Sequence, residues 1–151
     1  MPIPKNFTVI IDYAHTPDGL ENILKCIKGF SKGKIITVFG CGGDRDRTKR
    51  PEMGRIAQKM ADRIVVTSDN SRTEKTSDIM AEIKGGMDIS GRAKSLFIED
   101  RREAIRTAVM LASQGATILL AGKGHETYQI IGTEKRHFDE KEIVTEIFAA
   151  M

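Results

Sequence analysis

Short apolar runs alternate along the chain with stretches in which apolar residues recur every three or four positions. The apolar runs predict buried strands at 7–11, 34–39, 64–67, 95–98 and 117–121. The periodic stretches predict amphipathic helices from Pro17, from Pro51, over 77–84, over 101–113 and after Asp139. This alternation predicts one α/β domain over 1–151, with a Rossmann-like, mostly parallel sheet and helices on both faces.

Local signals mark two helix starts and one late change of pattern. Thr16 and Pro17 are typical of an N-cap and a first helical position, and Asp100 with Glu103 resembles a capping box. After the fifth strand, two short segments at 128–131 and 134–138 flank a glycine. They predict a small hairpin that can add an antiparallel edge strand to the sheet.

Composition describes an ordinary folded domain. The 151 residues are 40% hydrophobic and 30% charged, and the formal net charge of +3 is far from the basic stripe of a nucleic-acid-binding protein. No apolar run approaches the length of a membrane span, and 1–5 does not open a signal peptide. Cys26, Cys41 and three scattered histidines show no metal-ligand spacing. We therefore expect a cytoplasmic protein that binds no nucleic acid, membrane or metal.

The loop at 40–50 is dense in glycine and charge. It lies between a predicted strand and a predicted helix, the position where open α/β sheets usually bind ligands. Its glycines allow close approach to the backbone, and its arginines, such as Arg45 and Arg50, offer planar forks that fit carboxylate or phosphate. A mobile, solvated charged loop is the alternative interpretation.

Polar residues also follow the first, third and fifth predicted strands. Asp12 and His15 follow the first strand, and His15 can either contact a nucleotide or simply hold the start of the helix. The carboxyl ends of parallel strands meet at one edge of a sheet, so we expect all these loops to converge there.

Two of the loops have the chemistry to bind a zwitterion. Asp69, Asn70 and Arg72 offer an acceptor, an amide and a cation, although an Asx-type turn beside a solvated arginine is the alternative. In 122–126, backbone N–H groups and Lys123 can cradle an anion while Glu126 accepts from an ammonium group, although an ordinary turn is the alternative.

Two phosphate-binding fingerprints are absent. Neither Gly33-Lys34 nor Gly122-Lys123 has the upstream glycine and the following Ser or Thr of a GxxxxGK[ST] loop. No GxGxxG follows the first predicted strand. The domain alone therefore lacks the apparatus to hold a triphosphate with magnesium.

Four segments, in this order, carry a resemblance to a known family: DYAHTPD at 12–18, FGCGGDRDRTKRP at 39–51, DNSR at 69–72 and GKGHE at 122–126. Over nearly its whole length the chain resembles the C-terminal domain of the Mur ligases. The resemblance is strongest to the members that add the third residue of the peptidoglycan stem peptide. The resemblance implies an ATP-dependent amide ligase. Its central domain transfers the γ-phosphate to a substrate carboxyl, and its C-terminal domain presents the incoming amino acid, whose amine attacks the acyl phosphate.

The resemblance also implies roles for single residues. Those that match the binding site for the incoming diamino acid are Arg45, Asp69, Asn70, Arg72, Gly122 and Glu126. Arg45 and Arg72 would pair with carboxylates and Glu126 with an ammonium group. Asp12 and His15 match the segment at the nucleotide, and Arg50 is expected to face the phosphates.

The same resemblance implies the substrates. The family uses an arginine in the third loop for meso-diaminopimelate, whose distal carboxylate needs a cation. Meso-diaminopimelate would be added to UDP-N-acetylmuramoyl-dipeptide. ATP and Mg would be bound mainly by the central domain, which this sequence lacks.

Two features depart from the family pattern. Ser71 stands where the pattern usually has proline, which predicts a less rigid loop. The UDP-sugar-binding and ATPase domains are missing, so we expect an excised fragment that does not catalyse ligation alone. The alternatives are a free-standing module that binds an anionic metabolite and the C-terminal domain of a folylpolyglutamate synthetase.

Overall fold

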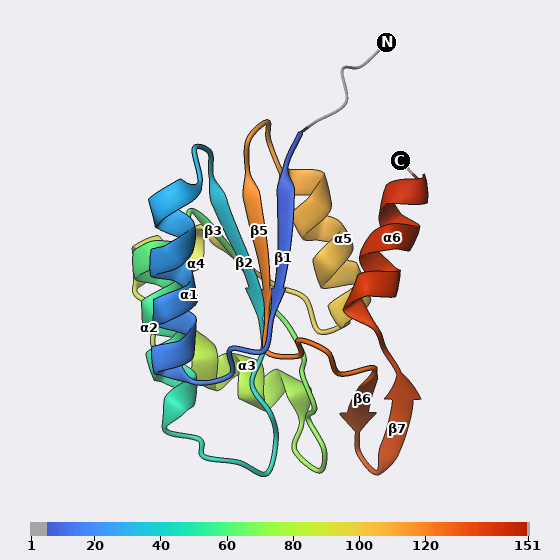
Figure 1. Ribbon diagram of the computed structural model, residues 1–151. Helices are drawn as coiled ribbons and strands as arrows, with labels where there is room; N and C mark the ends of the chain where they lie inside the picture. The colour runs from blue at the N-terminus through green and yellow to red at the C-terminus, as the bar shows by residue number, and fades with distance from the viewer. Residues whose placement is uncertain (1–5, 151) are drawn as a thin grey trace.

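The computed structural model describes residues 6–150. The expectation that residues 1–5 do not open a signal peptide concerns a segment outside this range. The main sheet has five parallel strands in the order β1-β5-β2-β3-β4 (Figure 1). Their bounds are β1 Thr8–Asp12, β2 Ile35–Phe39, β3 Arg63–Val66, β4 Ser95–Phe97 and β5 Thr117–Ala121. Strand β5, which comes last of these five in the sequence, therefore lies between β1 and β2 in the sheet.

Helices cover both faces of this sheet, as predicted (Figure 1). On one face lie α1 Pro17–Phe30, α2 Lys49–Met60, α3 Thr76–Lys84 and α4 Ile89–Ala93. On the other lie α5 Arg101–Leu111 and α6 Glu140–Ala150. None of these helices, which are all that residues 6–150 form, is long and apolar enough to cross a bilayer.

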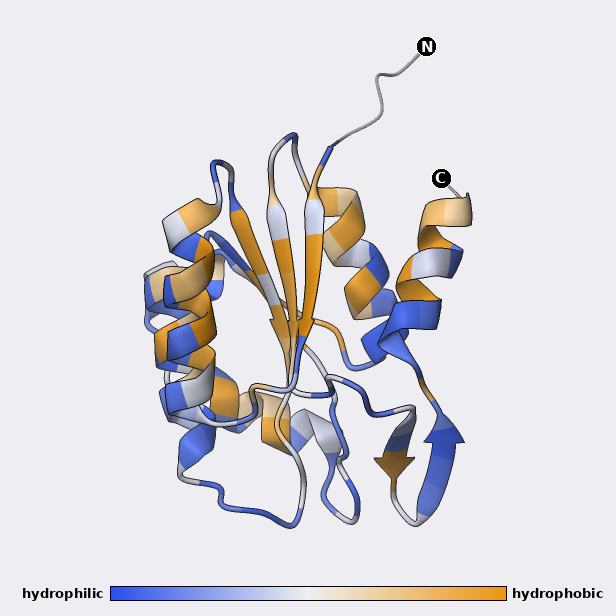
Figure 2. Cartoon of the chain, in the orientation of Figure 1, coloured by the Kyte–Doolittle hydropathy of each residue, from blue (hydrophilic) through white to orange (hydrophobic). Residues whose placement is uncertain are grey.

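Strand alternation divides the core into two apolar clusters. Ile35 and Phe39 point toward α1–α3, whereas Ile36 and Val38 point toward α5 and α6. Figure 2 shows the central strands of the main sheet, β1, β5 and β2, as largely hydrophobic and the loops at their carboxyl ends as largely hydrophilic. Burying a side chain of this size stabilises a fold by about 1.5–3 kcal/mol, so the two clusters hold the sheet rigid beneath its loops.

Local signals place the helix starts. Thr16 Oγ1 accepts a hydrogen bond from the N–H of Gly19 at 3.1 Å, and Asp100 Oδ1 accepts one from the N–H of Arg102 at 3.2 Å. Both residues therefore cap helices, as predicted.

Three details differ from the sequence expectations. Helix α2 begins at Lys49, so Pro51 is its third residue and not its first. Helix α4 was not predicted, because its five residues form no apolar stripe and Ile89 is 88% exposed. Strands β6 (Tyr128–Ile131) and β7 (Glu134–His137) form the predicted antiparallel hairpin, but as a separate two-stranded sheet and not as an edge of the main one.

Candidate functional site

Loops from four strands line one hollow at the carboxyl edge of the main sheet, with a volume of about 410 Å³. Its lining residues are Tyr13, His15, Thr16, Gly42, Arg45, Asp46, Lys49, Asp69, Asn70, Arg72, Gly122 and Glu126. All six residues predicted to bind a diamino acid are among them, and so is His15. The expected convergence of these loops therefore occurs.

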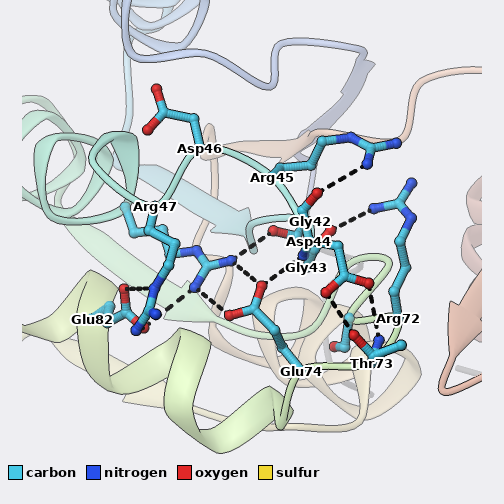
Figure 3. Close-up of polar contacts among 12 residues, drawn as sticks. Gly42, Gly43, Asp44, Arg45, Asp46, Arg47, Arg72, Thr73, Glu74 and Glu82 are labelled. Atoms are coloured by element: carbon cyan, nitrogen blue, oxygen red, sulfur yellow. Dashed lines mark hydrogen bonds and ion pairs between the residues drawn. The ribbon is translucent and has the colours of Figure 1, made fainter.

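The glycine-rich loop after β2 packs directly on the loop after β3. The N–H of Gly43 donates to the carbonyl of Asn70 at 2.7 Å, and a Cβ at position 43 would lie 1.8 Å from the carbonyl oxygen of Ser71. Asp44, at a φ of 56°, accepts a hydrogen bond from the Thr73 hydroxyl at 2.6 Å (Figure 3). Glycine is required at 43 because any side chain would separate the two loops.

Two arginines reach the hollow with most of their guanidinium groups unpaired. Within the described part of the chain, the Arg45 guanidinium makes one hydrogen bond, from Nη1 to the carbonyl of Asp44 at 3.1 Å. Arg72 Nη1 donates to the carbonyls of Gly43 and Asn70 at 3.0 and 3.2 Å. Both guanidinium groups lie on the same side of the glycine-rich loop (Figure 3). Each retains N–H donors that can bind a carboxylate.

Two carboxylates, those of Asp69 and Glu126, lie around the buried ammonium group of Lys123. Lys123 Nζ lies 3.1 Å from Asp69 Oδ1, 3.1 Å from Asn70 Oδ1 and 3.5 Å from Glu126 Oε1. The Lys123 side chain is fully buried, so it cannot cradle an anion, which corrects the expectation from the sequence. Two carboxylates around one ammonium leave a net negative charge, which suits a second, incoming ammonium group.

Gly122 brings the loop after β5 beside Asp69. Its φ is 115°, and a Cβ there would lie 3.1 Å from Asp69 Oδ2. A side chain at this position would meet both an unfavourable backbone conformation and the carboxylate. Gly122 therefore shapes the hollow by leaving space beside Asp69.

The structure does not bring Arg50 into the hollow. Its side chain is fully buried, with Nη1 and Nη2 donating to Glu74 at 3.0 and 2.6 Å and Nη2 donating to the carbonyl of Gly42 at 3.0 Å. A guanidinium with these partners cannot face a phosphate, and the expectation for Arg50 was wrong. The hydrogen bond from Arg50 lowers the pKa of Glu74 to about 2.

Asp12 is also outside the hollow, whereas His15 lines it. Asp12 Oδ2 accepts from the N–H of Ala14 at 2.9 Å, so its carboxylate supports the turn after β1. The His15 ring lies 4.8 Å from the Tyr13 ring, and Lys49 Nζ donates to the carbonyl of His15 at 3.0 Å. Tyr13 and Lys49 were not among the predicted site residues, although both stand in segments that the sequence singled out.

Ser71 does not leave its loop loose. Its hydroxyl lies 2.6 Å from the hydroxyl of Thr76, the first residue of α3, and both side chains are buried. This hydrogen bond anchors the loop to the helix. The expectation that a serine in place of proline makes the loop less rigid is therefore not supported.

The described residues do not provide a metal site or a reactive thiol. Within 6–150, no three His, Cys, Asp or Glu side chains lie where they could jointly hold a metal ion. Burial raises the pKa of the Cys41 thiol to about 12, so this thiol stays protonated and is not a nucleophile.

A family comparison agrees with this architecture. The model of the Mur ligase, glutamate ligase domain, matches residues 2–124. The chain belongs to the Mur ligase family.

Several relatives share one enzyme name, UDP-N-acetylmuramoyl-L-alanyl-D-glutamate--2,6-diaminopimelate ligase. The Bacteroides fragilis protein is 53% identical over 148 residues, which are 97% of this chain and 30% of the relative. The Clostridioides difficile protein is 50% identical over 151 residues, which are 100% of this chain and 31% of the relative. The chain thus spans about 30% of the length of these curated relatives.

Solved structures give the same picture of the fold. A structure of a ligase with that name superposes with a TM-score of 0.91 at 43% identity, covering 98% of this chain and 30% of that one. E. coli FolC in complex with ADP gives a TM-score of 0.56 at 19% identity, over 76% of this chain and 25% of that one. The second likeness shows the fold alone.

Proposed function

We propose that this chain is the amino-acid-presenting domain of an ATP-dependent ligase that adds meso-diaminopimelate to UDP-N-acetylmuramoyl-L-alanyl-D-glutamate. The relatives at 50% identity and above carry the name of that enzyme. The folylpolyglutamate synthetase alternative is not favoured, because its support is a fold likeness at 19% identity. The chain covers only part of these relatives, so the activity belongs to a longer protein.

One observation carries the proposal: the same hollow is lined both by guanidinium groups and by carboxylates. Arg45 and Arg72 offer free guanidinium donors, and Asp69 and Glu126 stand around a buried ammonium. Meso-diaminopimelate carries an amine and a carboxylate at each end. Arg72 would bind the distal carboxylate and Glu126 an ammonium group, which would orient the other amine for attack.

The nucleotide would contact the rim of the hollow that Tyr13, His15 and Lys49 form. Lys49 supplies a cation there, and the two rings supply stacking surface. ATP, when bound, supplies the phosphoryl group that activates the substrate carboxyl. The described residues do not fit a magnesium site, so Mg would be bound elsewhere in the longer protein. Both cysteines are free, which fits a reducing compartment such as the cytoplasm.

Titration of the ¹⁵N-labelled chain with meso-diaminopimelate tests the proposal. We expect saturable shifts at the amides of Asn70, Arg72 and Glu126. Arg72→Ala should weaken binding about tenfold or more, because it removes a charge-assisted hydrogen bond. Binding of L-lysine as tight as that of meso-diaminopimelate would contradict the role of Arg72.

A second assay separates a ligase domain from a free-standing binding module. We expect no phosphate release from ATP by the 151-residue chain when UDP-N-acetylmuramoyl-L-alanyl-D-glutamate and meso-diaminopimelate are both added. Release that depends on both compounds would show that the chain needs no further domain. Tight binding of a different anion, with no response to diaminopimelate, would favour the module.

A further inference from the structure

The hairpin of β6 and β7 follows the segment that the family model matches, and it contacts the loop at 68–72, three residues of which line the hollow. The match ends at residue 124, and β6 begins at Tyr128. Residues 128–137 belong to neither apolar cluster among the described residues, so the hairpin adds little to the core. Several of its hydrogen bonds go instead to the loop at 68–72.

The side chain of Gln129 is the first part of this contact. It is 8% exposed, and its Nε2 donates to Ser68 Oγ at 2.7 Å and to the carbonyl of Asp69 at 2.9 Å. One amide group therefore holds two consecutive residues at the start of the loop. Asp69 is one of the two carboxylates beside Lys123.

The backbone of β6 is the second part. The N–H of Ile130 donates to Asn70 Oδ1 at 2.9 Å, and Lys123 Nζ donates to the same oxygen at 3.1 Å. With both donors on Oδ1, Nδ2 of Asn70 is turned toward Glu126 Oε1, 3.5 Å away. Strand β6 thus sets which end of this amide faces the carboxylate.

The backbone of Arg72 is hydrogen-bonded on both sides of its Cα, by Ile130 of β6 and by Gly132 in the turn that follows it. Its N–H donates to the carbonyl of Ile130 at 3.1 Å, and its carbonyl accepts from the N–H of Gly132 at 2.7 Å. Arg72 has a φ of 53°, a conformation that is unfavourable for a residue with a side chain. Such a conformation persists only where the surroundings fix it, and here β6 and Gly132 do so.

We propose that strand β6 and the turn after it, through Gln129 and the backbone of Ile130 and Gly132, position Arg72 and thereby set the preference of the hollow for a diamino acid with a distal carboxylate. The inference rests on the proposed function. Gln129 is a positioning residue, because it touches the loop and not the ligand.

The test compares the dissociation constants of L-lysine and meso-diaminopimelate by NMR titration of the 151-residue chain. Gln129→Met keeps the length of the side chain and removes its donors. Arg136→Met, at the cross-strand partner position, changes an exposed side chain that bonds only to Glu134 and serves as the matched control. Arg72→Ala and the double variant with Gln129→Met complete a cycle. Thermal unfolding of every variant checks that it is folded.

We expect the parent chain to prefer meso-diaminopimelate by about tenfold or more. Gln129→Met should reduce this preference about threefold or more, and Arg136→Met should leave it unchanged. In the Arg72→Ala background, Gln129→Met should have no further effect on the preference. That non-additivity distinguishes positioning of Arg72 from a general loss of stability. If Gln129→Met does not fold, Gln129→Asn, which keeps the amide and shortens its reach, replaces it.

The outcomes separate this inference from the proposed function. If the parent chain prefers meso-diaminopimelate and the Gln129→Met variant keeps that preference, the role of β6 is overturned and the proposed function stands. Equal effects of Gln129→Met with and without Arg72 would also overturn it. A parent chain that binds neither amino acid would overturn the proposed function and this inference together.

Discussion

Arg45 and Arg50 belong to the same stretch of sequence, yet the first lines the hollow and the second is buried beneath it. The side chains of Arg50 and Arg101 are fully buried, and their nitrogens donate to carboxylates and backbone carbonyls. Among residues 6–150, the guanidinium groups of Arg45 and Arg72 bond only to backbone carbonyls and keep free N–H donors.

The difference lies in what surrounds each guanidinium group. Glu74 and Glu82 neutralise Arg50, and Glu140 neutralises Arg101. No carboxylate pairs with Arg45 or Arg72 among the described residues. Buried arginines with carboxylate partners hold the loops in place, whereas arginines without them are available to a ligand. Four predictions test this comparison.

The largest effect is expected from Glu140→Gln. It leaves the Arg101 guanidinium buried without its ion-pair partner at 2.9 Å, which should cost about 3–5 kcal/mol in the free energy of unfolding. Urea denaturation measures this change. The control is Glu146→Gln, which removes the exposed partner of Arg102 and should cost less than about 1 kcal/mol. Equal costs for the two variants would break the comparison.

Glu74→Gln should have the next largest effect. It removes the charge opposite Arg50 and weakens the acceptor of the Asp44 N–H at 2.6 Å, while Glu82 remains 3.3 Å from Arg50. We expect a loss of about 2–3 kcal/mol in the free energy of unfolding, below that for Glu140→Gln. Glu134→Gln on β7 is the control. A loss no larger than in this control would show that Arg50 does not depend on Glu74.

The third prediction concerns the pH dependence of stability. The pKa of Glu74 is about 2 in the folded chain, against an ordinary value of 4.5, because Arg50 donates to the charged form. Its contribution is therefore complete above about pH 4.5 and is lost as the pH falls toward 2. The stability difference between the parent chain and Glu74→Gln should narrow over this window in urea denaturation. A constant difference would contradict the assignment.

The smallest effect on stability is expected from Arg45→Gln. Because Arg45 is exposed and bonds only to the Asp44 carbonyl, the free energy of unfolding should change by less than about 0.5 kcal/mol. Binding of meso-diaminopimelate should nevertheless weaken in calorimetric titration. A large loss of stability would place Arg45 with the buried arginines.

The sequence predicted the main sheet well because its central strands are almost purely apolar. The runs at Ile35–Phe39 and Thr117–Ala121 are buried on both faces, so their composition alone identified them. Helix α4 lacks such a signal, since it is held by the Asp88 cap and by Gln58, far away in the sequence. A single pattern cannot reveal an element that depends on distant polar contacts.

The same limit applies to the hollow. The carboxyl ends of parallel strands lie at one edge of a sheet, and this rule predicted that one hollow would be lined by Arg45, Arg72 and Glu126. That Arg50 and Lys123 are buried did not follow, because their partners Glu74 and Asp69 stand elsewhere in the chain. Position along the sequence identified the candidate groups, and only the packing separated those that face a ligand from those that hold the loops.

The place of β5 in the sheet has a consequence for the order in which the chain folds. Strands β1 and β2 both pair with β5 and not with each other. Thr8 and Ile35 therefore both reach their pairing partner only when Thr117 has been synthesised. During synthesis, β1 and β2 emerge before β5, the strand that lies between them in the sheet. Assembly of the sheet is therefore a late, long-range event, and a chain that stops before β5 cannot close it.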